Sequence, residues 1–247
     1  MLRLLLFYVL LVPVTLYYSL RTLLLRPDAP EPLKHRYRGH AWGAWLVRAA
    51  GLDVQADFST LDPAGHYVFM INHQSNLDIP ILFSALGGYS IRFVAKKSLF
   101  DIPVFGRAMH KAGHISIDRA NRRDAMRSVE AAVGQARAGA CPVIFPEGTR
   151  NRSREELLDF KIGGMVLALK CGLPVAPVVM AGSGQALPKG GVLIRRRRPV
   201  RIRSLPVIDP ARYTLKDRER FRDELRQSMN AAFQELMAEV RACVREI

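Results

Sequence analysis

From residue 51 onward, short runs of β-branched and aromatic residues alternate with helical stretches, and this alternation limits the folds open to the chain. Strands are predicted at residues 67–71, 91–95, 114–117, 142–145 and 175–180. Helices are predicted at residues 121–137, where Met126, Val129, Val133 and Ala136 recur at helical spacing, and at residues 215–247. Strands that alternate with helices predict a layered α/β domain.

The N-terminal segment carries no charge from residue 4 to residue 20, between Arg3 and Arg21. A helix of this length falls just short of the roughly 20 residues that cross a bilayer core, and residues 23–25 extend it enough to span. Pro13 would kink such a helix, so a shallow insertion and a buried core helix stay open as alternatives. Because no small-residue cleavage site follows, we expect an uncleaved anchor in the inner membrane. The Lys and Arg residues that follow place the main body on the cytoplasmic side.

Residues 33–50 carry Trp42, Trp45 and Leu46 among basic residues. This pattern fits a helix at a membrane interface or an ordinary amphipathic helix packed on the body. We predict an N-terminal membrane anchor with an interfacial helix at residues 1–50, followed by a catalytic-sized domain at residues 51–247.

The chain is strongly basic, with 37 Lys and Arg residues against 22 Asp and Glu residues and a net charge of +15. Such an excess indicates an anionic partner: nucleic acid, acidic lipid or a phosphorylated substrate. Residues 189–203 hold seven cationic residues and no acid, and Val200 and Ile202 alternate with Arg201 and Arg203, which predicts a strand with one solvated basic face. Anionic headgroups, an acidic carrier protein or coenzyme A would fit this run, and a merely solvated face is the alternative. Nucleic acid fits less well, because the run has no interleaved aromatic residue for base stacking.

Three cysteines, Cys141, Cys171 and Cys243, are too few and too scattered for a disulfide framework or a tetrahedral zinc site. Each lies among apolar neighbours, which predicts buried thiols in a reducing compartment.

Two polar motifs directly follow predicted strands. In Asn72-His-Gln-Ser-Asn-Leu-Asp78, the His73 and Asp78 side chains can meet only if the chain turns between them, because positions five apart in a helix lie on different faces. A carboxylate can then hold one imidazole nitrogen while the other takes a proton, although Asp78 could instead only cap the next helix. Phe145-Pro-Glu-Gly-Thr-Arg150 offers loop N–H groups and a guanidinium suited to phosphate, or else a tight turn with a Glu147–Arg150 ion pair.

His73, Lys96, Arg119 and Arg150 each lie just after the carboxyl end of a predicted strand. Open α/β sheets place their ligand crevices at that edge. Together these positions favour a phosphate-bearing substrate and one general base.

These segments resemble the 1-acyl-sn-glycerol-3-phosphate acyltransferase family, and the resemblance covers residues 67–206. Its four blocks appear in order as Asn72-His-Gln-Ser-Asn-Leu-Asp78, Gly113-His-Ile-Ser-Ile-Asp-Arg119, Phe145-Pro-Glu-Gly-Thr-Arg150 and Leu173-Pro-Val-Ala-Pro-Val178. The resemblance implies a mixed, mostly parallel sheet flanked by helices, with an N-terminal membrane helix. It implies that His73 is the general base and that Asp78 orients it. The residues implied to bind the glycerol phosphate are Lys96, Arg119, Glu147, Gly148, Thr149 and Arg150.

The same resemblance implies transfer of an acyl group from acyl-CoA or acyl carrier protein to the sn-2 hydroxyl of 1-acyl-sn-glycerol-3-phosphate, giving phosphatidic acid. No metal or bound cofactor is implied. The expected partners are the lysophosphatidate acceptor, the acyl donor and an anionic membrane surface, without nucleic acid. An acyltransferase for another lyso-lipid, such as lyso-ornithine lipid, would show the same blocks, and a membrane-bound lipid-binding module without catalysis is a further alternative.

Overall fold

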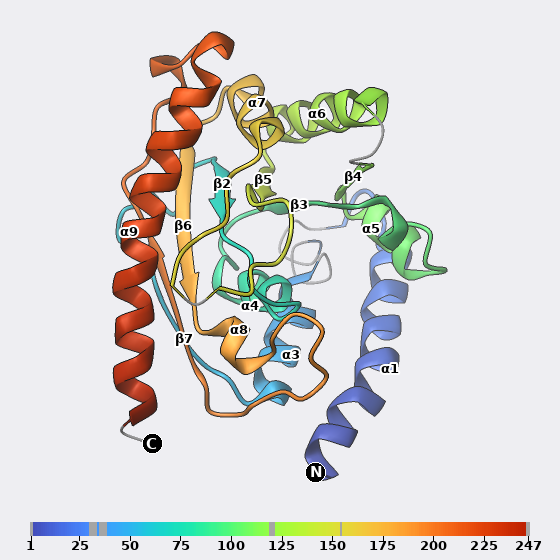
Figure 1. Ribbon diagram of the computed structural model, residues 1–247. Coiled ribbons are helices and arrows are strands. Elements are labelled where there is room, and N and C mark those ends of the chain that lie inside the picture. Colours follow the sequence, from blue (N-terminus) through green and yellow to red (C-terminus); the bar gives the residue numbers. More distant parts are fainter. Residues whose placement is uncertain (1, 30–33, 35–38, 119–121, 154, 246–247) are drawn as a thin grey trace.

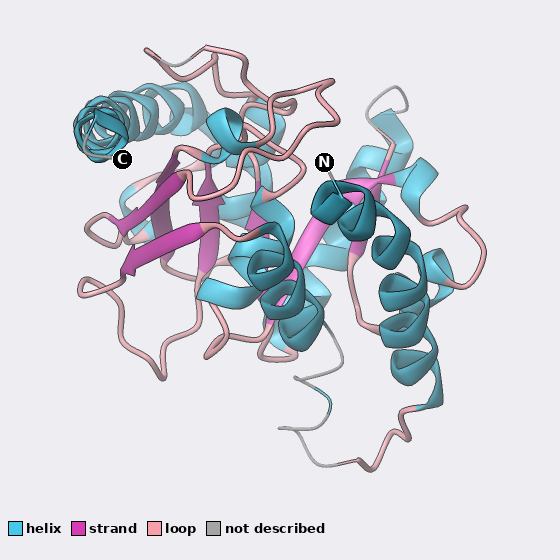
Figure 2. Ribbon diagram, turned by 90° about the horizontal axis from the view of Figure 1, so that it is seen from below, coloured by secondary structure: helices cyan, strands magenta, loops and turns pink. Residues whose placement is uncertain are grey.

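A seven-stranded sheet forms the centre of the molecule, and helices lie on both of its faces (Figures 1 and 2). The computed structural model describes residues 2–29, 34, 39–118, 122–153 and 155–245. The strands are β1 (Asp53–Asp57), β2 (Val68–Ile71), β3 (Ile91–Lys96), β4 (Ile115–Ile117), β5 (Cys141–Ile144), β6 (Val175–Ala181) and β7 (Pro199–Ser204). The α-helices are α1 (Leu2–Leu24), α3 (Ala41–Ala50), α4 (Asp78–Ala85), α5 (Phe105–Lys111), α6 (Arg122–Arg137), α7 (Ile162–Cys171), α8 (Ser183–Ala186) and α9 (Arg218–Arg245). The 3-10 turns are η2 (Lys97–Leu99), η3 (Pro210–Arg212) and η4 (Leu215–Asp217).

The sheet is mixed and mostly parallel, which confirms the predicted fold class. Its strand order is β1-β7-β6-β2-β5-β3-β4, and only the β6–β7 pair is antiparallel. Every residue of β2, β5 and β6 is buried, as expected for continuous apolar runs covered on both faces. Sequence reasoning missed β1, because this edge strand is mostly exposed and has no apolar run.

Two hydrophobic cores lie on opposite faces of the sheet, and β2 contributes to both. Val68 and Met70 pack into the core that includes α7 and α9, whereas Phe69 and Ile71 pack into the core that includes α3 and α4. This alternation follows the two-residue period of a strand. Each such fully buried side chain contributes about 1.5–3 kcal/mol to folding, so the strand is fixed from both sides.

Both predicted long helices are present, with differences at their ends and faces. In α6 the buried apolar positions are Val129, Ala132 and Ala136, whereas Met126, one of the residues whose spacing predicted this helix, is 45% exposed. The C-terminal helix α9 begins at Arg218 rather than at residue 215, because residues 215–217 form the 3-10 turn η4.

The N-terminal helix α1 continues through Pro13 as one α-helix. Residues 7–24 are long and apolar enough to cross a membrane, and 17% of them are buried, which differs from a buried core helix. Helix α3 packs against α1 and α4 with Gly43, Leu46 and Ala50 buried, as in the body-packed alternative. Most of residues 33–40, which were expected to begin this helix, lie outside the described residues.

Two expectations about cysteine and arginine side chains were wrong. Cys141 is buried, but Cys171 and Cys243 are only half-buried. The basic face of β7 is neutralised rather than simply solvated, because Arg201 pairs with Asp53 at 3.1 Å and Arg203 pairs with two glutamates on α9. The sheet therefore uses part of the basic run for internal ion pairs.

Candidate active site

The carboxyl ends of β2, β5 and β6 meet at one edge of the sheet, because these neighbouring strands are parallel. The arrowheads of β2 and β6 point to the lower end of the molecule in Figure 1. Asn72 continues this edge beyond β2: its side chain donates to the Met180 carbonyl at 2.8 Å and accepts from the Met180 N–H at 2.7 Å. The next residue, His73, is thereby placed at the rim.

The predicted turn between His73 and Asp78 is present and brings the two side chains into contact. His73 Nδ1 lies 2.7 Å from Asp78 Oδ2, which also accepts the backbone N–H groups of Gln74 and Ser75. The aspartate side chain is fully buried, whereas that of His73 is 17% exposed. Because a carboxylate only accepts hydrogen bonds, Nδ1 carries the proton and Nε2 keeps a free lone pair. The arrangement can take a proton from a group in solvent-accessible space.

Contacts on other sides also hold the imidazole. Its ring stacks on Phe145 with centroids 4.1 Å apart, and the His73 carbonyl accepts the Asn151 N–H at 2.6 Å. Sequence reasoning missed Asn151, which is buried and forms further hydrogen bonds with Ser153 and Glu156. The loop after β5 is thus tied to the loop after β2.

Glu147 binds the two motif loops together through backbone amides. Its Oε1 accepts the His73 N–H at 2.9 Å, its Oε2 accepts the Leu158 N–H at 3.0 Å, and the residue is 1% exposed. The expected contact with the glycerol phosphate is therefore not open to this carboxylate, and in the described part of the chain it does not pair with Arg150. Burial raises the pKa of Glu147 to about 7, although the two N–H donors offset part of this shift.

This shifted pKa predicts a pH dependence of stability. Between the ordinary pKa of 4.5 and about 7, the folded protein keeps a proton on Glu147 that the unfolded chain releases. Ionisation therefore destabilises the fold, and we expect the free energy of unfolding to fall by about 3 kcal/mol across this window. Urea unfolding at several pH values would show this fall for the wild type and a flatter profile for Glu147→Gln. Parallel profiles for the two proteins would contradict the assignment.

The remaining residues of the second motif form a tight loop after β5. Gly148 has φ 70°, a left-handed conformation that glycine adopts without strain. Lys189 donates to Thr149 Oγ1 at 3.0 Å and to the Arg150 carbonyl at 3.1 Å. The half-buried Arg150 side chain has no hydrogen bond or ion pair with any described residue. Lys189 thus joins the site from a run that the sequence assigned only to an external surface.

A cavity of about 430 Å³ opens beside this loop and beside Gln74, the residue after His73. Its lining includes Gln74, Asn151, Arg152 and Lys189. The buried Oε1 of Gln74 has no hydrogen-bond partner among the described residues. The lining of the cavity therefore combines the cationic side chains of Arg152 and Lys189 with polar side chains.

The two remaining residues predicted to bind the phosphate are Lys96 and Arg119, and the structure describes only Lys96. Lys96 is exposed at the end of β3, the neighbour of β5 on the side away from β2. Arg119 lies outside the described residues, just beyond the end of β4 at Ile117. The geometry therefore groups His73, Asp78 and the loop after β5, and leaves Lys96 at the neighbouring strand end.

Comparisons with known proteins agree with this architecture. The Acyltransferase family model matches residues 54–181. A 1-acyl-sn-glycerol-3-phosphate acyltransferase of Salmonella typhimurium is 30% identical over 208 residues, which are 82% of this chain and 79% of that protein. The corresponding protein of Escherichia coli is 31% identical over 181 residues, covering 71% of this chain and 70% of that protein.

Other comparisons cover only part of the relative's length or show the fold alone. The chloroplastic acyltransferase BAT2 of Brassica napus is 36% identical over 135 residues, which are 55% of this chain and 38% of that protein. The chain thus spans less than two fifths of the length of this relative, and equally of the relatives from Chlamydomonas reinhardtii and Arabidopsis thaliana. The solved structure of the 1-acyl-sn-glycerophosphate acyltransferase from Thermotoga maritima has a TM-score of 0.78 at 23% identity and covers 96% of both chains.

The fold and site define an α/β protein with a histidine–aspartate pair at the carboxyl edge of its sheet. The chain belongs to the 1-acyl-sn-glycerol-3-phosphate acyltransferase family. Its apolar helix α1, together with its bacterial relatives, indicates that it associates with a membrane.

Proposed function

We propose that this chain transfers an acyl group from acyl-CoA or acyl carrier protein to the sn-2 hydroxyl of 1-acyl-sn-glycerol-3-phosphate, forming phosphatidic acid. The observation that carries the proposal is the pairing of a buried Asp78 carboxylate with the partly exposed His73 imidazole. The names of the Salmonella and Escherichia coli relatives supply the substrate class.

In the proposed reaction, His73 Nε2 takes the proton of the acceptor hydroxyl as its oxygen attacks the thioester carbonyl carbon. A carbon–oxygen bond forms, and negative charge builds on the carbonyl oxygen until the carbon–sulfur bond breaks. The imidazolium then returns the proton to the departing thiolate. Asp78 stabilises the imidazolium and holds its orientation throughout.

The acceptor phosphate is proposed to bind at the loop after β5 and at the neighbouring strand ends. Arg150, Lys96 and Arg119 supply the positive charge, and the loop at Gly148 and Thr149 supplies backbone N–H groups. Glu147 is a positioning residue here, because its carboxylate is buried on two backbone amides. Lys189 positions the same loop through its contacts with Thr149 and the Arg150 carbonyl.

Arg150→Ala is expected to weaken binding of the phosphorylated acceptor more than binding of the acyl donor. Loss of one charge-assisted contact to a phosphate costs about 1.5–3 kcal/mol, or about ten- to a hundredfold in affinity. Arg150→Lys would restore only part of it, because an ammonium cannot reproduce the two-pronged geometry. Steady-state kinetics with each substrate varied in turn would measure the effect. Equal changes in the KM of donor and acceptor would contradict this role.

We propose that residues 1–50 anchor the protein in the cytoplasmic membrane and that residues 51–247 catalyse the reaction on its cytoplasmic side. The uncharged run in α1, and the excess of cationic residues after it, support this orientation. An anionic bilayer surface would then concentrate the basic protein near its lipid acceptor.

The test is an assay of the purified full chain with several lyso-lipid acceptors, each offered with acyl-CoA and with acyl carrier protein. The proposal predicts phosphatidic acid from lysophosphatidate as the fastest product with at least one donor. Faster acylation of a lyso-ornithine lipid would instead assign the chain to that acceptor. Absence of transfer to every acceptor would overturn the proposed activity.

A further inference from the structure

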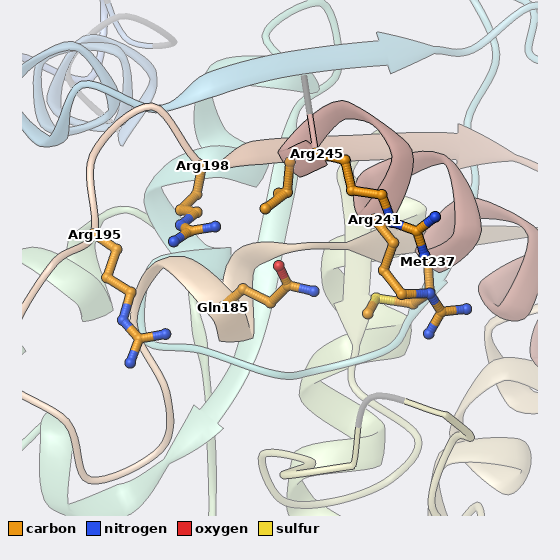
Figure 3. Close-up of a pocket in the computed structure, with 7 residues that line it drawn as sticks. Gln185, Arg195, Arg198, Met237, Arg241 and Arg245 are labelled. Carbon is orange, nitrogen blue, oxygen red and sulfur yellow. The ribbon is translucent and has the colours of Figure 1, made fainter. Parts of the chain in front are cut away.

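A second cavity, of about 350 Å³, lies between α9 and the loop at residues 187–198 that follows α8. Its lining residues are Gln185, Arg195, Arg198, Met237, Arg241, Val244 and Arg245. Figure 3 shows the two loop arginines and the two helix arginines on different sides of a common space, near the Gln185 amide. Four cationic side chains from two distant parts of the chain thus surround one concave site, called here the arginine pocket.

The arginine pocket differs from the other basic surfaces of the same elements. Arg201 and Arg203 on β7, and Arg220 and Arg222 on α9, all form ion pairs with carboxylates. None of the side chains of the four pocket arginines has a hydrogen bond or ion pair with a described residue. Neighbouring like charges repel one another, so this arrangement is favoured when an anion binds among them.

The loop that supplies two of these arginines also exposes apolar side chains. Val192 is 70% exposed and Leu193 is 62% exposed, just before Arg195. The Tyr8 hydroxyl of α1 donates to the Val192 carbonyl, so the loop is tied to the candidate membrane helix. Helix α1 itself exposes Val9 and Val12 close to this contact. Apolar side chains flanked by arginines are typical of segments that enter a membrane interface.

The position of the arginine pocket fits a surface that faces the bilayer. The C-terminal end of α9, the loop after α8 and the N-terminal end of α1 lie toward the lower end of the molecule in Figure 1, and β2 and β6 point toward that end. Gly184 on α8 packs close to Gln74, the residue after His73. A bilayer at this end would therefore lie on the side from which a lipid acceptor reaches His73.

We propose that the arginine pocket binds the phosphate headgroup of an anionic phospholipid while Val192 and Leu193 enter the bilayer beside α1. The proposal rests on the membrane-bound acyltransferase activity proposed above. It adds a second, lipid-selective contact that orients the active site toward the bilayer. It also assigns a discrete site to Arg241 and Arg245, which the basic run at residues 189–203 does not include.

The decisive experiment compares two charge-matched double variants of the full chain. Arg241→Gln/Arg245→Gln removes the helix side of the pocket, and Arg196→Gln/Arg197→Gln removes two arginines of the basic run that do not line it. Each protein is floated with vesicles of phosphatidylcholine, with and without phosphatidylglycerol. The pocket variant should lose roughly a hundredfold in its preference for the anionic vesicles, because it removes two charge-assisted contacts to the headgroup phosphate and each such contact contributes at least about tenfold. The control variant should lose much less.

Equal losses in the two variants would overturn the arginine pocket in favour of a diffuse basic surface. Val192→Ser/Leu193→Ser should weaken binding to both kinds of vesicle, and unchanged binding would contradict insertion of the loop.

In a vesicle-free assay with a short-chain soluble acceptor, the pocket variant should keep the wild-type KM for acyl-CoA. A raised KM with unchanged flotation would assign the pocket to the donor phosphates and overturn the proposal. If the wild type transferred no acyl group at all, the proposed activity would fail, whereas flotation would still decide on the pocket.

Discussion

His73→Ala is expected to reduce acyl transfer by about 10²–10⁴-fold, the range that a positioned general base contributes. The side chain packs on Phe145 and is hydrogen-bonded to Asp78 through Nδ1, and it is 17% exposed. Turnover of lysophosphatidate by the purified variant measures the loss. Circular dichroism and the unfolding midpoint should stay close to those of the wild type, because the side chain contributes modest packing at the rim.

A matched control is available in the same chain. His66 is exposed in the loop before β2, so His66→Ala should leave turnover unchanged. Retention of more than a few per cent of wild-type turnover by His73→Ala would contradict the general-base assignment.

Asp78→Asn is expected to reduce turnover by about 10²-fold through loss of charge. One oxygen, Oδ2, accepts from His73 Nδ1 and from two backbone N–H groups, while the buried Oδ1 has no hydrogen-bond partner within the described part of the chain. An asparagine can keep its oxygen at the Oδ2 position, which preserves the orientation of the imidazole. It then cannot stabilise the imidazolium by charge, and replacing this charge-assisted hydrogen bond with a neutral one costs about 1.5–3 kcal/mol.

The same substitution should lower stability as well. In this orientation the asparagine amide nitrogen takes the place of Oδ1, where a buried donor without a partner costs about 1–3 kcal/mol. Urea unfolding would measure the change. Wild-type turnover together with wild-type stability in Asp78→Asn would show that the buried charge has no part in the mechanism.

Local sequence patterns predicted the central part of the fold and of the site. Strands β2, β5 and β6 are continuous apolar runs, and burial on both faces makes such runs recognisable. His73 and Asp78 are close in sequence, so one turn brings them together. Met126 fits the helical period that predicted α6, although its side chain is exposed and lies outside the buried face.

No local sequence pattern predicted the contacts between segments that lie far apart in the chain. Lys189 reaches the loop after β5 from 40 residues beyond Thr149, and nothing in its neighbourhood distinguishes it from the other cations of the basic run. Glu147 was expected to face substrate, because its sequence does not show that two backbone amides surround its carboxylate. The arginine pocket likewise joins residues of a loop and of α9 that only the tertiary fold brings together.

The central claim is that His73 and Asp78 act as one catalytic unit. Residues that act as a unit have non-additive effects, whereas independent residues have effects that multiply. The most direct measurement is therefore kcat/KM for lysophosphatidate in the wild type, His73→Ala, Asp78→Asn and the double variant. We predict that the double variant is no slower than His73→Ala alone, because Asp78 acts only through the imidazole. A double variant slower by the product of the two single losses would contradict the account.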